Sequence, residues 1–193
     1  LQRGGNTLGV PENFVLHAGE IVGLHGASGS GKSSFGDVLL GLLTPQQGSI
    51  TRHVAASALK YQKIYQDPSA LFPPMRTLSQ SLEEVLRRHR IERSKRDTLM
   101  EQLALESSLL TRCPDSLSGG ELQRFSLLRV MLLEPVFLFA DEPTSRLDPL
   151  VQQQTLQLIT QMARQQQCGV LLVSHDRELL EKGTDRVIAM QAA

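Results

Sequence analysis

A glycine-rich stretch near the N-terminus constrains the fold of this chain more than any other feature. The residues Gly26, Ala27, Ser28, Gly29, Ser30, Gly31, Lys32 and Ser33 match the pattern GxxxxGK[ST] in full. The short apolar segment 20–24 before it suits a strand, and residues 33–43 after it carry apolar side chains at helical spacing. A strand, a glycine loop and a helix in this order predict a phosphate-binding loop, a context that a chance glycine turn lacks.

The phosphate loop also predicts how a nucleotide is bound. Backbone N–H groups of the loop and the N-terminus of the following helix attract phosphate oxygens. Lys32 neutralises phosphate charge, and the Ser33 hydroxyl is a ligand for Mg²⁺. We therefore expect ATP and Mg²⁺ as cofactors, with every residue from Gly26 to Ser34 in the nucleotide-binding set.

Strand and helix patterns alternate along most of the remaining chain. We expect strands at 49–50, 60–66, 136–140, 170–173 and 186–190, and helices at 149–167 and 176–182. Residues 77–133 are rich in charge and leucine and read as a helical lobe. The pattern predicts an α/β fold, with a parallel sheet flanked by helices and the helical lobe inserted into it. Residues 1–193 then form a single domain, with a core at about 1–68 and 135–193 and a helical subdomain at about 69–134.

Charge, hydropathy and cysteine content argue against a nucleic-acid partner, a bilayer-spanning segment and disulfide bonds. Lys plus Arg and Asp plus Glu both number 20, so the formal net charge is zero and nothing in it favours nucleic acid. The apolar run 130–140 is interrupted by Glu134 and Pro135 and is shorter than the roughly 20 residues that span a bilayer. Two cysteines, far apart and without a signal peptide, favour reduced thiols in the cytosol. The chain begins at Leu1 rather than Met, so we expect part of the natural N-terminus to be missing.

Two adjacent carboxylates follow the most apolar strand of the chain. Asp141 and Glu142 come directly after Phe137-Leu138-Phe139-Ala140. The carboxyl end of a parallel strand faces the ligand crevice, so both side chains are expected near the phosphates. Asp141 can hold Mg²⁺, and Glu142 can orient or deprotonate the attacking water. An acidic helix cap is the structural alternative for either residue alone.

A second glycine pair opens a helix in the helical lobe. Its residues are Leu117, Ser118, Gly119, Gly120 and Glu121, followed by Leu122, Gln123 and Arg124. Backbone amides at a helix N-terminus form an anion site. Because one nucleotide cannot occupy two such sites on opposite lobes, we expect this one to cap the γ-phosphate of an ATP held by a partner subunit.

Together these motifs resemble the nucleotide-binding domain of ABC transporters, and the resemblance covers nearly the whole chain. It implies further roles at matching positions. Gln66 resembles the Q-loop glutamine that contacts Mg²⁺ and the attacking water. Ser145 and Asp148 belong to a segment that resembles the D-loop at the dimer interface. His175 resembles the switch histidine at the γ-phosphate, which makes Glu142, His175 and Gln66 the catalytic candidates and Ser33, Gln66 and Asp141 the Mg²⁺ candidates.

The stretch from Gln66 to Met75 looks most like the ATP-binding subunits of peptide and nickel importers. The resemblance implies a Mg²⁺-dependent ATPase on the cytoplasmic side of the inner membrane, paired with a second ATP-binding subunit. It also implies permease subunits that dock near Gln66–Met75, where Leu71, Phe72 and Met75 are expected to be exposed, and an extracytoplasmic substrate-binding protein. Import is favoured over export by this resemblance and by the lack of a fused membrane domain. A soluble ABC ATPase of DNA repair or translation, an exporter subunit and a weakly hydrolysing regulatory module are the alternatives.

Three features depart from the family or stay unassigned. No Tyr or Trp precedes Gly26, and Phe14 has the wrong spacing, so the adenine-stacking residue is left unassigned. Arg146 replaces the small residue that is common in the D-loop and predicts a charge at the dimer interface. The basic cluster at 87–96 is interpreted as a solvated helical face rather than a nucleic-acid or lipid site.

Overall fold

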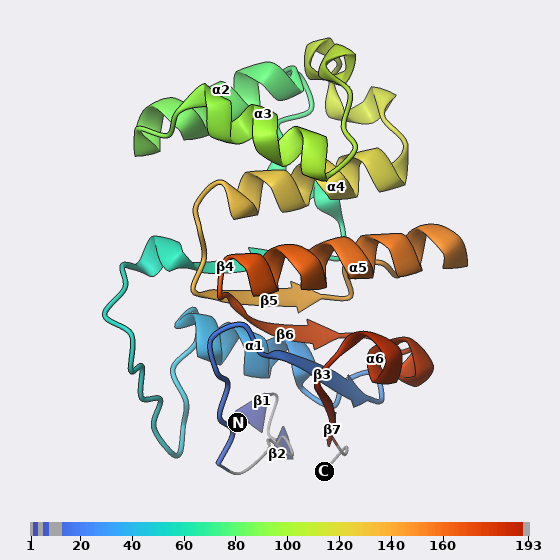
Figure 1. Ribbon diagram of the computed structural model, residues 1–193. Coiled ribbons are helices and arrows are strands. Elements are labelled where there is room, and N and C mark those ends of the chain that lie inside the picture. The colour runs from blue at the N-terminus through green and yellow to red at the C-terminus, as the bar shows by residue number, and fades with distance from the viewer. Residues whose placement is uncertain (1, 4–5, 8–12, 191–193) are drawn as a thin grey trace.

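The fold is built on a five-stranded parallel sheet. The computed structural model describes residues 2–3, 6–7 and 13–190 (Figure 1). The strands are β3 (Ile21–Gly26), β4 (Tyr61–Ile64), β5 (Phe137–Asp141), β6 (Gly169–Val173) and β7 (Arg186–Met190), in the order β4-β5-β6-β3-β7. All four pairings are parallel, so the carboxyl ends of the strands meet at one edge. A separate antiparallel pair joins β1 (Gln2–Arg3) to β2 (Asn6–Thr7).

Helices cover both faces of the sheet. Helix α1 (Lys32–Leu40) lies on one face, against β3, β4 and β5, whereas α5 (Pro149–Gln165) and α6 (Arg177–Gly183) lie on the other. Alternate side chains of a strand point to opposite faces. In β5, Phe137 and Phe139 therefore join the cluster under α1, while Leu138 and Ala140 join the larger core on the opposite side. The central strands β3, β5 and β6 are buried on both faces, which explains their largely apolar sequences.

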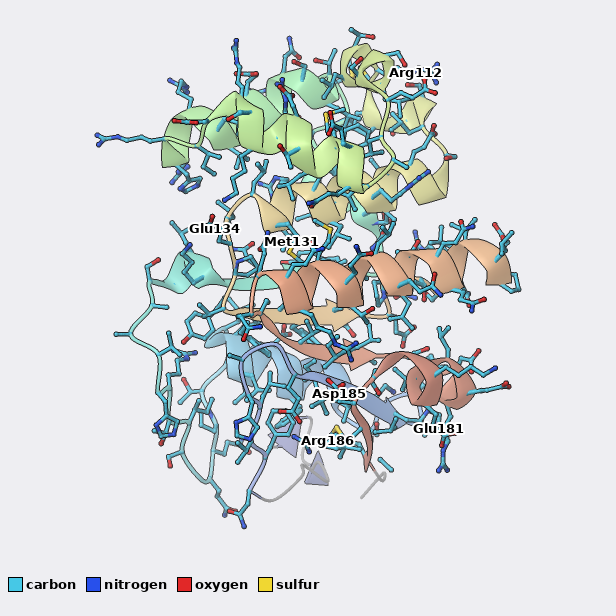
Figure 2. All side chains as sticks on the ribbon, in the orientation of Figure 1. Arg112, Met131, Glu134, Glu181, Asp185 and Arg186 are labelled. Carbon is cyan, nitrogen blue, oxygen red and sulfur yellow. The ribbon has the colours of Figure 1, made fainter. Side chains whose placement is uncertain are left out.

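A helical lobe is inserted between β4 and β5. It consists of α2 (Leu78–His89), α3 (Arg93–Gln102) and α4 (Gly119–Met131), and Figure 1 shows it stacked beyond α5, away from α1. Capping boxes begin α2 and α4: the Thr77 and Ser118 side chains accept from the backbone N–H three residues on. After α4 the chain passes from Met131 through Glu134 into β5, as Figure 2 shows. The α/β fold with an inserted helical lobe is thus confirmed.

Element boundaries differ from the sequence-based expectations at a few places. The predicted strand at 49–50 is wrong: both residues are exposed, outside any strand, and pair with nothing among the described residues. The helix expected over 33–43 ends at Leu40, because Gly41 adopts a left-handed conformation with φ 81° and caps it. Within the described ranges no helix is long and apolar enough to cross a bilayer. Cys113 and Cys168 are both free, and burial raises the pKa of Cys168 to about 12.

Gly36 makes room for the aromatic ring that packs beneath α1. A Cβ atom at this position would lie 2.2–2.4 Å from three ring atoms of Phe139, which is fully buried. We expect Gly36→Ala to lower the free energy of unfolding by about 1–3 kcal/mol, since overpacking outweighs the better helix propensity of alanine. Thermal denaturation measures the change, at about 2–4 °C per kcal/mol for a chain of this size.

The double variant Gly36→Ala/Phe139→Leu is the matched control, because the smaller side chain removes the clash. The double variant should recover most of the decrease in melting temperature that Gly36→Ala causes. The recovery is not complete, because Phe139→Leu alone leaves a cavity and is itself destabilising. If the destabilisation of the double variant equals the sum of the destabilisations of the two single variants, the contact between Gly36 and Phe139 does not determine the stability of this core.

Candidate functional site

The phosphate loop links the carboxyl end of β3 to the start of α1. Gly29 and Gly31 have φ of 81° and 96°, a left-handed region that favours glycine. The Lys32 side chain is buried and folds back over the loop, where Nζ donates to the carbonyl oxygens of Gly26 (2.7 Å) and Ala27 (2.9 Å). The Ser30 hydroxyl is buried and has no hydrogen-bond partner among the residues that the structure describes. The loop therefore presents a cation and a free hydroxyl next to a helix N-terminus, which suits a polyphosphate.

Ser33 and Asp141 lie together beside the loop. The Ser33 hydroxyl donates to Oδ1 of Asp141 over 3.2 Å, joining the first turn of α1 to the end of β5. Hydroxyl and carboxylate oxygens are ligands that Mg²⁺ accepts, with water and phosphate oxygens completing its octahedron. The pair fits an Mg²⁺ ion shared with a nucleotide, as the sequence predicts.

Glu142 is the centre of a hydrogen-bonded group formed by three chain segments. One carboxylate oxygen lies 2.7 Å from Nε2 of His175, which follows β6, and the other lies 3.5 Å from Nε2 of Gln66, which follows β4. Gln66 also donates to the Ser145 hydroxyl over 3.2 Å. Glu142 has φ of 50°, an unusual conformation for a residue other than glycine. The three catalytic candidates predicted from the sequence thus lie in one place, at the carboxyl edge of the sheet.

The D-loop candidates connect this group to α5. Asp148 caps α5, with its side chain accepting from the backbone N–H of Val151 over 3.2 Å. Arg146, predicted to place a charge at the dimer interface, pairs within the chain with Asp67 at 2.8 Å. Hydrogen bonds from Ser69, together with Arg146, hold the pKa of Asp67 below its usual value. Because both partners of this ion pair are exposed, it contributes little to stability.

The glycine pair of α4 lies against the D-loop of its own chain. A Cβ atom at Gly119 would lie 3.4 Å from the Leu147 side chain, and one at Gly120 would lie 3.0 Å from the Val151 side chain. The Ser118 N–H and hydroxyl both donate to Glu121, at 2.8 and 2.7 Å, and these hydrogen bonds lower the pKa of that carboxyl. None of the described contacts joins this motif to the phosphate loop, consistent with a site for another subunit's nucleotide.

The predicted docking stretch is only partly exposed. Met75 is 91% exposed, but Phe72 is 4% exposed and belongs to the main core, so the expectation for Phe72 is wrong. Leu71 is half-buried and packs against the same core. The short 3-10 helix Pro68–Leu71 turns the chain inward after Gln66, which carries Phe72 between the lobes.

Two further sequence expectations concern aromatic and basic side chains. Phe14, already set aside for adenine stacking, packs edge-on against Phe35 of α1 with ring centroids 5.3 Å apart. In the basic cluster, Arg93 and Arg96 both pair with Glu83 at 2.9 Å. The charge of the cluster is therefore partly neutralised within the helical lobe.

Sequence reasoning missed a partly buried ion pair next to Asp141. Lys63 of β4 lies 2.7 Å from Asp37 of α1 and 3.5 Å from Asp141. A lysine within a short strand is the only signal that the sequence offers, and its partner lies 26 residues away. Their proximity depends on the packing of α1 against β4, which periodicity alone does not specify.

Comparison with known proteins places these motifs in a family. Residues 11–145 match the ABC transporter family. A putative peptide import ATP-binding protein of Brucella ovis is 34% identical over 95% of this chain and 64% of its own length. The nickel import ATP-binding protein NikE of Pseudomonas putida is 33% identical over 92% of this chain and 71% of its own length. The oligopeptide transport ATP-binding protein OppF of Salmonella typhimurium is 31% identical, covering 91% and 58%. The chain thus spans less than two thirds of the Brucella protein and of OppF.

Solved structures show the same fold at lower identity. A dimeric bacterial ABC transporter cassette superposes with a TM-score of 0.76 at 22% identity, over 93% of this chain and 84% of the cassette. The cbiO1 protein of Clostridium perfringens gives a TM-score of 0.78 at 21% identity, over 91% and 76%. Since the family match covers well over half of its residues, this chain belongs to the ABC transporter family.

Proposed function

We propose that this chain is a Mg²⁺-dependent ATPase subunit that energises an ABC importer. The observation that carries the proposal is the group around Glu142, where His175 and Gln66 hold a carboxylate next to the phosphate loop. A carboxylate fixed in this way can orient and activate a water molecule for attack on the γ-phosphate. A protein that only binds nucleotide has no need for such an arrangement.

Each residue of the site has a proposed part in this reaction. Lys32 and the loop amides bind the β- and γ-phosphates, and Ser33 and Asp141 hold Mg²⁺, with Gln66 as a further candidate ligand. The ion neutralises charge as it develops on the phosphate oxygens. Glu142 accepts a proton from the attacking water, and His175 keeps that carboxylate in place. In ATP, the adenine ring has no assigned partner in this chain.

We also propose that two ATP-binding subunits close head to tail. The amides and hydroxyl at the start of α4 would cap the γ-phosphate bound by the phosphate loop of the other subunit. Ser145 and Asp148 would lie at the interface, and the helical subdomain, at about 69–134, would move against a core of about 1–68 and 135–193. The cycle of closure and reopening can do mechanical work only because ATP binds the closed state better than ADP does.

The transport part of the proposal follows from the relatives. Their names describe peptide import, nickel import and oligopeptide transport, so we propose one of these substrate classes. The chain would work on the cytoplasmic side of the inner membrane, bound to permease subunits that contact the stretch from Gln66 to Met75. A substrate-binding protein on the other side would deliver the cargo. The exposed Met75 side chain is the apolar contact that this docking region offers.

The concentration dependence of ATP turnover tests the proposed function. With Mg²⁺ present, the rate of the purified chain should rise more steeply than linearly with protein concentration, because each complete site needs two subunits. A steady-state phosphate-release assay measures it, and EDTA should abolish the rate. Nucleotide binding without turnover at every concentration would reject a self-sufficient homodimer and require a different partner subunit. Absence of nucleotide binding would reject the proposed function.

A further inference from the structure

A partly buried ion pair lies on the far side of Asp141 from Ser33. Lys63 Nζ is 2.7 Å from Oδ1 of Asp37 and 3.5 Å from Oδ2 of Asp141. The Ser33 hydroxyl engages the other oxygen of Asp141, Oδ1, over 3.2 Å. Both carboxylate oxygens of Asp141 therefore have a defined neighbour, and the one beside Ser33 is turned toward the phosphate loop.

The fold brings the three charged side chains together from three elements. Lys63 pairs with Phe139 in the β4–β5 register, and its ammonium lies over the Phe139 ring, 4.9 Å from the centroid. Only 12% of the Lys63 side chain is exposed, against 25% for Asp37 and 17% for Asp141. A lysine desolvated to this degree is stable only when an anion lies next to it.

The net charge of Lys63 and Asp37 affects how strongly a divalent cation binds next to Asp141. Lys63 alone would place a positive charge one carboxylate away from the candidate Mg²⁺ ligands and would repel the metal. Asp37 alone would add a negative charge there and would attract it. A charge within about 4–6 Å of a carboxylate changes its affinity for a cation by about tenfold or more. As a pair, Lys63 and Asp37 cancel in charge but still hold Asp141 in one orientation.

We propose that the Lys63–Asp37 ion pair positions the Asp141 carboxylate and sets the Mg²⁺ affinity of the nucleotide site. The inference rests on the proposed function, in that Asp141 must be an Mg²⁺ ligand. Lys63 and Asp37 act through Asp141 and do not themselves contact nucleotide. Substitution of Lys63 or Asp37 should therefore change the Mg²⁺ concentration that the site requires, while the fold is kept.

Opposite effects of two single variants test the proposal. The measured quantity is the Mg²⁺ concentration that gives half of the thermal stabilisation produced by saturating ADP. Lys63→Met leaves Asp37 uncompensated and should lower this concentration about tenfold, whereas Asp37→Asn leaves Lys63 uncompensated and should raise it about tenfold. The double variant Lys63→Met/Asp37→Asn leaves no free charge but also loses the contact that orients Asp141, so its midpoint should lie between those of the two single variants.

Lys60→Met is the matched control. Lys60 precedes β4 and contacts Glu134, 3.5 Å away at the other end of β5, so its removal should not change the Mg²⁺ midpoint. Melting without nucleotide shows whether each variant is folded. If Lys63→Met alone does not fold, Asp37→Asn and the double variant still give the predicted difference.

The outcomes separate this inference from the proposed function. If the Mg²⁺ midpoint shifts in the same direction in both single variants, or does not shift in either, the proposed role of the pair is overturned while nucleotide binding stays intact. A wild-type protein that ADP and Mg²⁺ do not stabilise would overturn the proposed function, and this inference with it.

Discussion

Glu142→Gln should reduce ATP turnover by about 10²–10⁴-fold and leave ATP binding intact. Glutamine keeps the size of the side chain and a hydrogen-bonding oxygen for His175, but it cannot accept a proton from the attacking water. ATP that binds without being hydrolysed also holds the closed state, so the variant should form a dimer that depends on ATP. Phosphate release measures the first effect, and size-exclusion chromatography with ATP measures the second.

Glu134→Gln is the control for this substitution. Glu134 lies at the amino end of β5, opposite Glu142, where it contacts Lys60 and Lys95 (Figure 2). The same chemical change there should leave turnover near the wild-type rate. If Glu142→Gln keeps most of its activity, Glu142 does not activate the water, and the proposed assignment of the group around it is wrong.

The positions of the site residues could be predicted from the sequence because they follow a rule of topology. Parallel strands end at one edge, so residues directly after separate strands must approach each other. Gln66, Glu142 and His175 each follow a different strand, and the hydrogen bonds of Glu142 to Gln66 and His175 confirm that these strand ends meet. Their catalytic and ligand roles stay predictions until the variants are measured.

Long-range packing explains what the sequence did not predict. Phe72 lies in a stretch with turn residues and was expected to be exposed, but its side chain is buried in the main core. The pairing of Lys63 with Asp37 depends on how α1 crosses β4, and no periodicity of either segment encodes that crossing. Local patterns fix which elements form and which face is apolar, whereas contacts between elements depend on the completed fold.

Two inactive variants should restore activity to each other when mixed. Gly119→Asp is designed to block the α4 site: a Cβ atom there meets only Leu147 at an ordinary 3.4 Å, and aspartate is tolerated in a first helical turn. Its carboxylate would repel the partner's γ-phosphate, so the variant alone should be inactive. Mixed with Glu142→Gln, it forms a heterodimer in which one complete site remains. Random pairing sets an upper limit of about a quarter of the wild-type rate, because half of the dimers are then mixed and each has one of two sites, whereas ATP favours the Glu142→Gln homodimer.

This experiment is specific for head-to-tail geometry, because the two variants are defective in different halves of the shared site. Lys32→Ala mixed with Glu142→Gln is the control, since both changes affect the half of the site that a chain supplies to its own nucleotide. Both sites of that heterodimer are then defective, and no activity should return. If the mixture of Gly119→Asp and Glu142→Gln also stays inactive, although both variants are folded and bind ATP, this chain does not complete its site with a second copy of itself. The anion site at the start of α4 would then have to face the nucleotide of a different subunit.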